Sequence, residues 1–173
     1  MASAPIPTGR LFRAENSLYD LTLVRSFRAA PGALWEWITH PQRTAKWIGP
    51  WRGEAGTGRS IELQLTGEEG APWTTVRIED CEPPHLLAVS TVDDAGSMEL
   101  QVRLTERNGE TELTFVHHLT DPAAAESMGP GWEYYLDALV AAHNGLPAPN
   151  FSDYYPAQAE HFVAEARHAL SRS

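Results

Sequence analysis

The middle of the chain consists of short stretches in which apolar and polar residues alternate, with turn residues between them. The stretch 98–104, MELQVRL, shows this most clearly, because every second residue is apolar. Asn108-Gly109 follows it and is a strong signal for a tight hairpin. Strands joined by short turns are antiparallel neighbours, since parallel strands need long crossovers. Residues 53–119 therefore predict an antiparallel meander with one apolar and one polar face.

An apolar sheet face needs a cover, and one predicted helix is long enough to provide it. The helix is expected to begin at Asp121-Pro122, a cap followed by a first-turn proline, and to end at Asn144-Gly145. Its second half has apolar and aromatic residues at helical spacing: Trp132, Tyr135, Leu136, Leu139, Val140 and His143. The expected fold class is α+β, with the sheet folded around this helix.

The regions that flank the meander complete the expected organisation. Residues 19–27 alternate as a strand, and Pro31 and Pro41 each open a short helix. The first residues are rich in Pro, Ala and Ser, although Leu11 and Phe12 could add an edge strand. An amphipathic stretch near the end is expected to dock on the outside. The predicted divisions are an arm at 1–18, a single domain at 19–145 and a C-terminal extension with a docked helix at 146–173.

The composition argues against some classes of binding partner and against some cellular locations. The 173 residues have a formal net charge of -10, which disfavours binding to nucleic acid because phosphates repel an acidic surface. No apolar run approaches the roughly 18 residues that cross a bilayer, and the start does not resemble a secretory signal. Cys81 is the single cysteine, so no internal disulfide can form and a cytoplasmic protein is expected. We expect a monomer or a homodimer. We expect no metal and no cofactor.

Two features of the predicted long helix resemble functional motifs but have plainer explanations. Gly129-Pro130-Gly131 lacks the lysine and hydroxyl residue of a phosphate-binding loop, so we interpret it as a kink or restart of the helix. Gly131 is expected to let the helix approach the sheet closely. Glu133 and Asp137 are spaced like paired carboxylates, but they lie opposite the apolar face, and we predict that they are solvated.

The remaining polar candidates are a few histidines and the cysteine. His117 shares a strand face with apolar residues and is expected to point inward, either as a hydrogen-bonded core residue or as a ligand contact. His118 points the other way, so the two cannot bind one metal ion. A nucleophile–base pair of Cys81 and His85 is disfavoured, because the surrounding acidic residues raise the pKa of the thiol.

Two stretches carry a resemblance to a known family. They are RSFRAAPGALWEWITHPQRTAKWIGP and GPGWEYYLDAL. Both resemble the activator-of-Hsp90-ATPase-homologue domain, within the superfamily of START-like, Bet v 1-like and polyketide-cyclase-like proteins, over roughly residues 19–145. The resemblance implies a helix-grip fold, in which a curved antiparallel sheet of about seven strands wraps around a long C-terminal helix. It also implies a cavity for hydrophobic or amphipathic molecules.

The resemblance and the aromatic residues together suggest a binding site between the sheet and the long helix. The residues expected to contact a ligand are Trp47, Trp51, Met98, Leu100, Phe115, His117, Trp132, Tyr135, Leu136 and Leu139. The leading hypothesis is a protein that binds a hydrophobic or aromatic small molecule, lipid-like or polyketide-like. One alternative is a co-chaperone-like or stress-response module that binds a protein partner. Another is a cyclase or aromatase with His117 or Tyr135 as the reactive group, although no catalytic residue is assigned.

Overall fold

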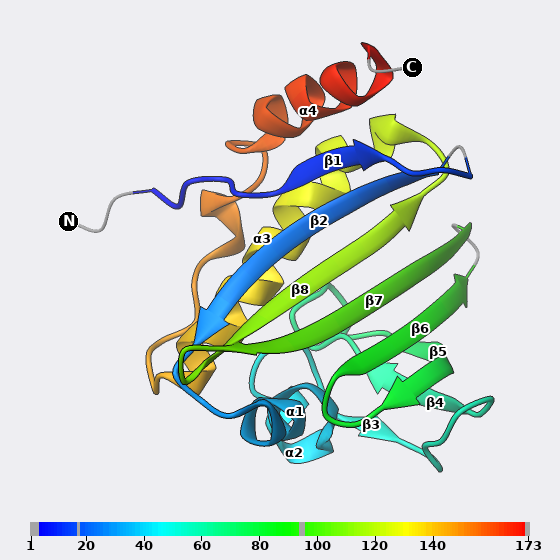
Figure 1. The fold of residues 1–173 in the computed structure, drawn as a ribbon, viewed down its shortest axis with the longest axis vertical. Coiled ribbons are helices and arrows are strands. Elements are labelled where there is room, and N and C mark those ends of the chain that lie inside the picture. Colours follow the sequence, from blue (N-terminus) through cyan, green and yellow to red (C-terminus); the bar gives the residue numbers. More distant parts are fainter. Residues whose placement is uncertain (1–3, 17, 94–95, 172–173) are drawn as a thin grey trace.

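The computed structural model describes residues 4–16, 18–93 and 96–171. One curved antiparallel sheet bends around a long helix (Figure 1). Its eight strands follow the order β1-β2-β8-β7-β6-β5-β4-β3. Residues 1–3 and 17 of the predicted arm, and 172–173 of the predicted extension, lie outside the described residues.

The elements occur along the chain in the predicted order. The strands are β1 (Arg10–Arg13), β2 (Tyr19–Phe27), β3 (Trp51–Arg52), β4 (Ser60–Gln64), β5 (Trp73–Glu82), β6 (Leu86–Asp93), β7 (Gly96–Arg107) and β8 (Glu110–Leu119). The helices are α1 (Pro31–Thr39), α2 (Pro41–Thr44), α3 (Ala125–His143) and α4 (Ala159–Ser171), with 3-10 turns η1 (Pro122–Ala124) and η2 (Phe151–Asp153). The predicted fold class is confirmed, with eight strands in place of about seven.

The hydrophobic core lies between α3 and the β2–β8 half of the sheet. β2 and β8 pair along their whole length, from Tyr19 opposite Leu119 to Phe27 opposite Thr111. Their inward side chains are enclosed, as the period-2 pattern requires. α3 runs behind these two strands in Figure 1 and contacts β2. Its buried residues Leu136 and Leu139 belong to the same core.

The start of α3 follows the sequence, but its glycines act differently from the prediction. Asp121 Oδ1 accepts a hydrogen bond of 2.9 Å from the Ala123 N–H and caps η1, which leads into α3. The helix then continues through Pro130, so the predicted restart is wrong. Gly131 is not the close contact either, because a Cβ there would have no neighbour within 4 Å. Gly129 is the close contact, and a Cβ there would overlap the ring of Phe162 on α4.

Two tryptophan side chains donate hydrogen bonds to carbonyl groups at the C-terminal end of α1. Trp47 Nε1 donates to the carbonyl oxygen of Trp37 over 2.9 Å, and Trp51 Nε1 donates to that of Thr39 over 2.8 Å. Carbonyls in the last turn of a helix have no partner within the helix, so these two indoles provide one. α2 itself ends at Thr44, and the chain then turns into β3.

The two ends of the chain pack on each other and on α3. β1 pairs with β2, and α4 contacts both α3 and β1. Leu11 donates its backbone N–H to Glu165 over 3.2 Å, and His161 Nε2 lies 2.8 Å from the Gly9 carbonyl oxygen. Both ends therefore approach α3 on the side away from β6 and β7 (Figure 1). In the part of the chain that the structure describes, no helix is long and apolar enough to cross a membrane.

Candidate functional site

The inward face of the sheet is unevenly covered. On β2 and β8, Leu21, Leu23 and Phe115 are buried. Two inward rows of side chains continue onto β7, where His117 faces Leu100 and Phe115 faces Val102. Burial falls along these two rows, because Leu100 and Val102 are half-buried. The half-buried residues of this region form what we call the open patch: Leu87, Val89, Met98, Leu100 and Val102. Solvent therefore reaches an apolar surface in the middle of the sheet.

Two aromatic side chains of α3 stand beside the enclosed half of the face. The ring centroid of Trp132 lies 4.5 Å from that of Phe115, 6.1 Å from that of His117 and 5.9 Å from that of Tyr135. Trp132 and Tyr135 are half-buried, whereas Leu136 and Leu139, also on α3, are buried. The α3 residues predicted to contact a ligand thus divide into core residues and residues with an accessible edge.

His117 is held in one neutral form by its neighbour. Trp132 Nε1 donates to His117 Nδ1 over 3.1 Å, so the proton of the neutral ring resides on Nε2. Burial, and to a lesser extent the charge of His118, lowers the pKa of His117 to about 4. The ring is therefore neutral near pH 7 and presents an N–H donor. With this pKa it is a weak base, so hydrogen bonding suits it better than general-base catalysis.

Tyr135 also remains protonated, and an acidic loop lies near it. Burial raises the pKa of Tyr135, and the charge of Glu68 and the neighbouring Tyr134 act in the same direction. Burial also raises the pKa of Glu68, which lies in the loop between β4 and β5. A Cβ built on Gly67 in that loop would lie 3.8 Å from the Tyr134 hydroxyl. The loop thus brings a carboxylate to α3.

Thr91 is a polar residue that the sequence analysis did not single out. It lies on β6 opposite Met98 of β7 and Val76 of β5. Thr91 is two residues from Val89, so both side chains lie on the inward face. Thr91 is only 6% exposed. Among the residues that the structure describes, its hydroxyl has no hydrogen-bond partner. The signal in the sequence was a threonine at an apolar position of a strand, which is too common to be diagnostic.

The other predicted ligand residues lie in different surroundings. Met98 and Leu100 belong to the open patch, and Phe115 belongs to the core. Trp47 and Trp51 are half-buried beside α1, where their indole N–H groups are already in use. Cys81 lies within β5 opposite Leu87, and burial together with the charge of Asp80 raises the pKa of its thiol.

The prediction that Glu133 is solvated is wrong. Its carboxylate accepts hydrogen bonds from the backbone N–H and hydroxyl groups of Thr8 and from the Gly9 N–H, and it pairs with Arg25. Asp137 is half-buried and bonds both Arg25, over 2.9 Å, and the Tyr154 hydroxyl, over 2.7 Å. Helical spacing could not reveal this network, because most of its partners lie more than a hundred residues away along the chain.

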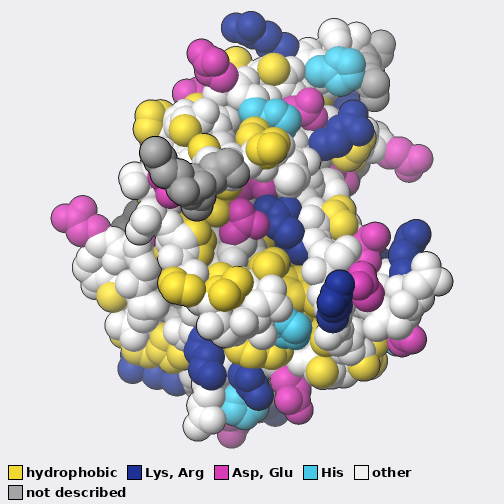
Figure 2. All heavy atoms as spheres, turned by 90° about the vertical axis from the view of Figure 1, so that its left-hand side faces the viewer, with side chains coloured by type: hydrophobic (Ala, Val, Ile, Leu, Met, Phe, Trp, Pro, Cys, Tyr) yellow, Lys and Arg dark blue, Asp and Glu magenta, His cyan; other side chains and the backbone are white. Residues whose placement is uncertain are grey.

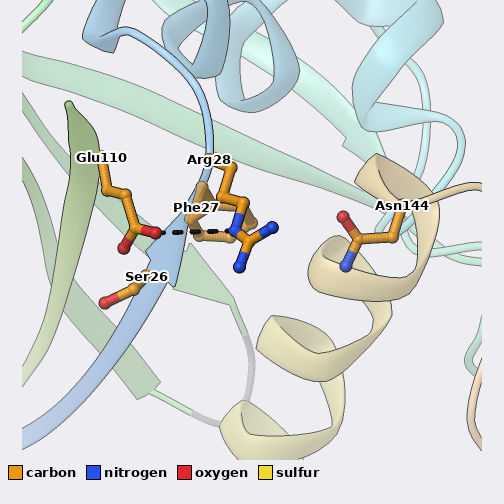
Figure 3. A pocket seen from close by; sticks show the side chains of 5 residues that line it. All are labelled: Ser26, Phe27, Arg28, Glu110 and Asn144. Carbon is orange, nitrogen blue, oxygen red and sulfur yellow. Dashed lines mark ion pairs between the residues drawn. The ribbon is translucent and has the colours of Figure 1, made fainter.

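Two surface hollows lie away from the open patch. One, of about 320 Å³, is lined by Ser26, Phe27, Arg28, Glu110 and Asn144 (Figure 3). Its Arg28–Glu110 ion pair, 3.6 Å long, is solvated, since the Arg28 side chain is 93% exposed. The other, of about 240 Å³, lies between η1, the start of α3 and α4. None of the ten residues predicted to contact a ligand lines either hollow.

The outer surface carries mixed charge. Figure 2 shows hydrophobic side chains in small groups between acidic and basic ones on the side of the molecule at the left of Figure 1. His118 faces outward as predicted, with its Nδ1 2.6 Å from Asp20. Within the described ranges, no group of three or more His, Cys, Asp or Glu is placed to hold a metal ion.

Comparison with known proteins identifies the family. The family described as activator of Hsp90 ATPase homolog 1-like protein matches residues 28–144. The chain belongs to this family. The family resemblance, expected over roughly residues 19–145, is thereby confirmed over residues 28–144. No curated protein matches the chain in sequence.

Solved structures share the fold of this family member. The crystal structure of CalU16 from Micromonospora echinospora superposes with a TM-score of 0.75 at 23% identity, covering 95% of this chain and 99% of CalU16. Its solution structure gives 0.76 at the same identity, covering 98% and 100%. DynU16, from the dynemicin biosynthetic locus, gives 0.65 at 20% identity, covering 76% of this chain and 50% of DynU16. The helix-grip fold expected from the sequence is therefore confirmed.

Proposed function

We propose that this family member binds a hydrophobic or aromatic small molecule, lipid-like or polyketide-like, between the open patch and α3. The observation that carries the proposal is the contrast in burial across one face of one sheet. Leu21 and Leu23 are enclosed, whereas Leu100 and Val102, in the same rows, are half-buried. An apolar ligand that covers the open patch would gain about 25 cal/mol for each Å² of apolar surface removed from water.

The side chains around the open patch suit such a ligand. Met98 is flexible and polarisable, so it can adapt to different shapes. Trp132 and Tyr135 offer aromatic edges on the α3 side. Their rings fill part of the space between helix and sheet, so we expect them to change rotamer when a ligand enters. DynU16 comes from a biosynthetic locus, which supports a small-molecule role for a protein of the same fold.

Native mass spectrometry of protein purified from its own host tests the proposal directly. We expect a co-purifying apolar molecule, and a panel of lipids and polyketides should raise the melting temperature of protein from which that molecule has been removed. Protein that carries nothing and that does not respond to the panel would contradict the proposal.

A matched pair of variants locates the site. Leu100→Gln places an amide in the open patch and should weaken binding of whichever panel member responds. Val116→Gln makes a similar change on the neighbouring strand β8, but on the outward face, and should leave binding unchanged. Equal effects of the two variants would place the site elsewhere.

A further inference from the structure

The inward face beside the open patch carries a hydrogen-bond donor with a fixed direction. His117 Nδ1 is occupied by the indole N–H of Trp132, which leaves Nε2–H as the donor of the neutral ring. Within the described residues, this bond from Trp132 is the hydrogen bond in which the His117 side chain takes part. His117 lies opposite Leu100, a member of the open patch. The ring can therefore donate to a ligand that lies on the patch, but it cannot accept from one.

A second polar group lies on the same face two strands away. Thr91 is buried, and its hydroxyl has no partner among the described residues. A buried hydroxyl without a partner is unfavourable, and a ligand with a suitable oxygen would provide the missing hydrogen bond. His117 and Thr91 are separated by two strand spacings of about 4.8 Å each, and by about two residues along the strands. A molecule the size of two or three fused rings spans that separation.

The charges around this region oppose an anionic ligand. Glu68 of the β4–β5 loop lies close enough to Tyr135 to influence its ionisation. Arg25 reaches the inward face from β2, but its guanidinium already pairs with Glu133 and Asp137. A carboxylate bound here would meet the acid of the loop, and Arg25 would be unable to compensate it.

From these three observations we infer the chemical class of the ligand: an uncharged apolar molecule with an acceptor oxygen of the ketone or quinone type at each end, one bound by His117 Nε2–H and the other by the Thr91 hydroxyl. The inference rests on the proposed function and refines it, because apolar burial alone would not distinguish a ketone from a hydrocarbon or a fatty acid.

Three probes with one ring system test the inference: 2,6-diacetylnaphthalene, 2,6-diethylnaphthalene and naphthalene-2,6-dicarboxylate, measured at pH 7 by equilibrium dialysis. We expect the ketone to bind about tenfold more tightly than the hydrocarbon, because each of its two hydrogen bonds contributes about threefold. The carboxylate should bind most weakly. Thr91→Val and His117→Phe should each reduce the preference for the ketone at least about threefold and leave binding of the hydrocarbon nearly unchanged.

Thr114→Val is the matched control, because Thr114 lies on β8 next to Phe115 but faces outward. It should keep the full preference for the ketone. If His117→Phe does not fold, Thr91→Val decides alone, since valine has the same shape and removes a buried hydroxyl that lacks a partner.

The outcomes separate the two proposals. If none of the probes binds, the proposed function fails and the inference fails with it. If ketone and hydrocarbon bind equally, if the carboxylate binds best, or if Thr91→Val keeps the full preference, the inference is overturned while apolar binding stands.

Discussion

Arg25 and Glu133 form a buried ion pair, with Arg25 Nη2 2.7 Å from Glu133 Oε1 and the two side chains 11% and 1% exposed. The pair joins β2 to α3, and Glu133 also holds the backbone of Thr8 and Gly9. Burial alone would lower the pKa of Arg25, but the hydrogen bonds and charges of Glu133 and Asp137 outweigh it and raise that pKa. One carboxylate therefore joins β2, the N-terminal segment and the long helix.

Replacing Glu133 by glutamine should destabilise the protein by about 3 kcal/mol, because it leaves the buried Arg25 with Asp137 as its remaining acidic partner. Urea denaturation measures the change. Hydrogen exchange of the Thr8 and Gly9 amides should also accelerate, since both donate to this carboxylate. Glu126→Gln, at an exposed position of α3, is the control and should change stability by less than about 0.5 kcal/mol. Equal losses of stability in the two variants would show that the Arg25–Glu133 ion pair does not stabilise the fold.

The two glycines that flank Pro130 should respond in opposite ways to alanine. Gly129→Ala directs a methyl group into the ring of the fully buried Phe162 and should cost about 1–3 kcal/mol. Gly131→Ala meets no neighbour within 4 Å and should stabilise the helix by roughly 0.5–1 kcal/mol. Thermal unfolding compares the two directly. Combining Gly129→Ala with Phe162→Leu should cost less than the sum of the separate changes, because the smaller side chain relieves the overlap. Simple additivity would show that the contact carries no strain.

The sequence contained enough information to predict the architecture. Three features depend on local chemistry, which a single sequence displays: the alternating positions of β7, the Asn108-Gly109 turn, and the Asp121-Pro122 start of the segment that leads into α3. The strand count was close for the same reason. β3 was not predicted, because two residues are too few to show a period.

Features that depend on distant partners could not be predicted in the same way. Glu133 has an ordinary surface spacing on its helix, and its burial results from Arg25 and the N-terminal segment. The open patch has the same apolar pattern as the enclosed rows on β2 and β8, so only the position of α3 distinguishes them. Thr91 became notable because its hydroxyl is both buried and without a partner in the described structure. These properties arise from packing and not from residue type.

Stability should fall in acid partly because His117 must remain neutral to stay buried. Its pKa is about 4 in the folded protein, below the ordinary value of 6.5, so the unfolded chain binds the proton more readily. The contribution is complete above pH 6.5 and is lost as the pH falls from there to about 4. The difference in unfolding free energy between wild type and His117→Leu should shrink by about 3 kcal/mol over that window.

The comparison of wild type with His117→Leu removes the acid dependence that comes from carboxylates, because both proteins contain the same carboxylates. His168→Leu, at an exposed position of α4, should leave the acid dependence as it is in the wild type. A difference between wild type and His117→Leu that stays constant from pH 7 to pH 4 would mean that His117 titrates normally.

The tautomer of His117 should depend on Trp132. With the indole N–H donating to Nδ1, ¹⁵N NMR of the imidazole should show an unprotonated Nδ1 and a protonated Nε2 near pH 7. Trp132→Phe removes the donor, so the ring should become a mixture of both tautomers. Trp47→Phe also removes an indole donor, but one that bonds the Trp37 carbonyl, and it should leave the His117 signals in place. A protonated Nδ1 in the wild-type protein would contradict both the bond from Trp132 and the donor role of Nε2, whatever ligand the protein binds.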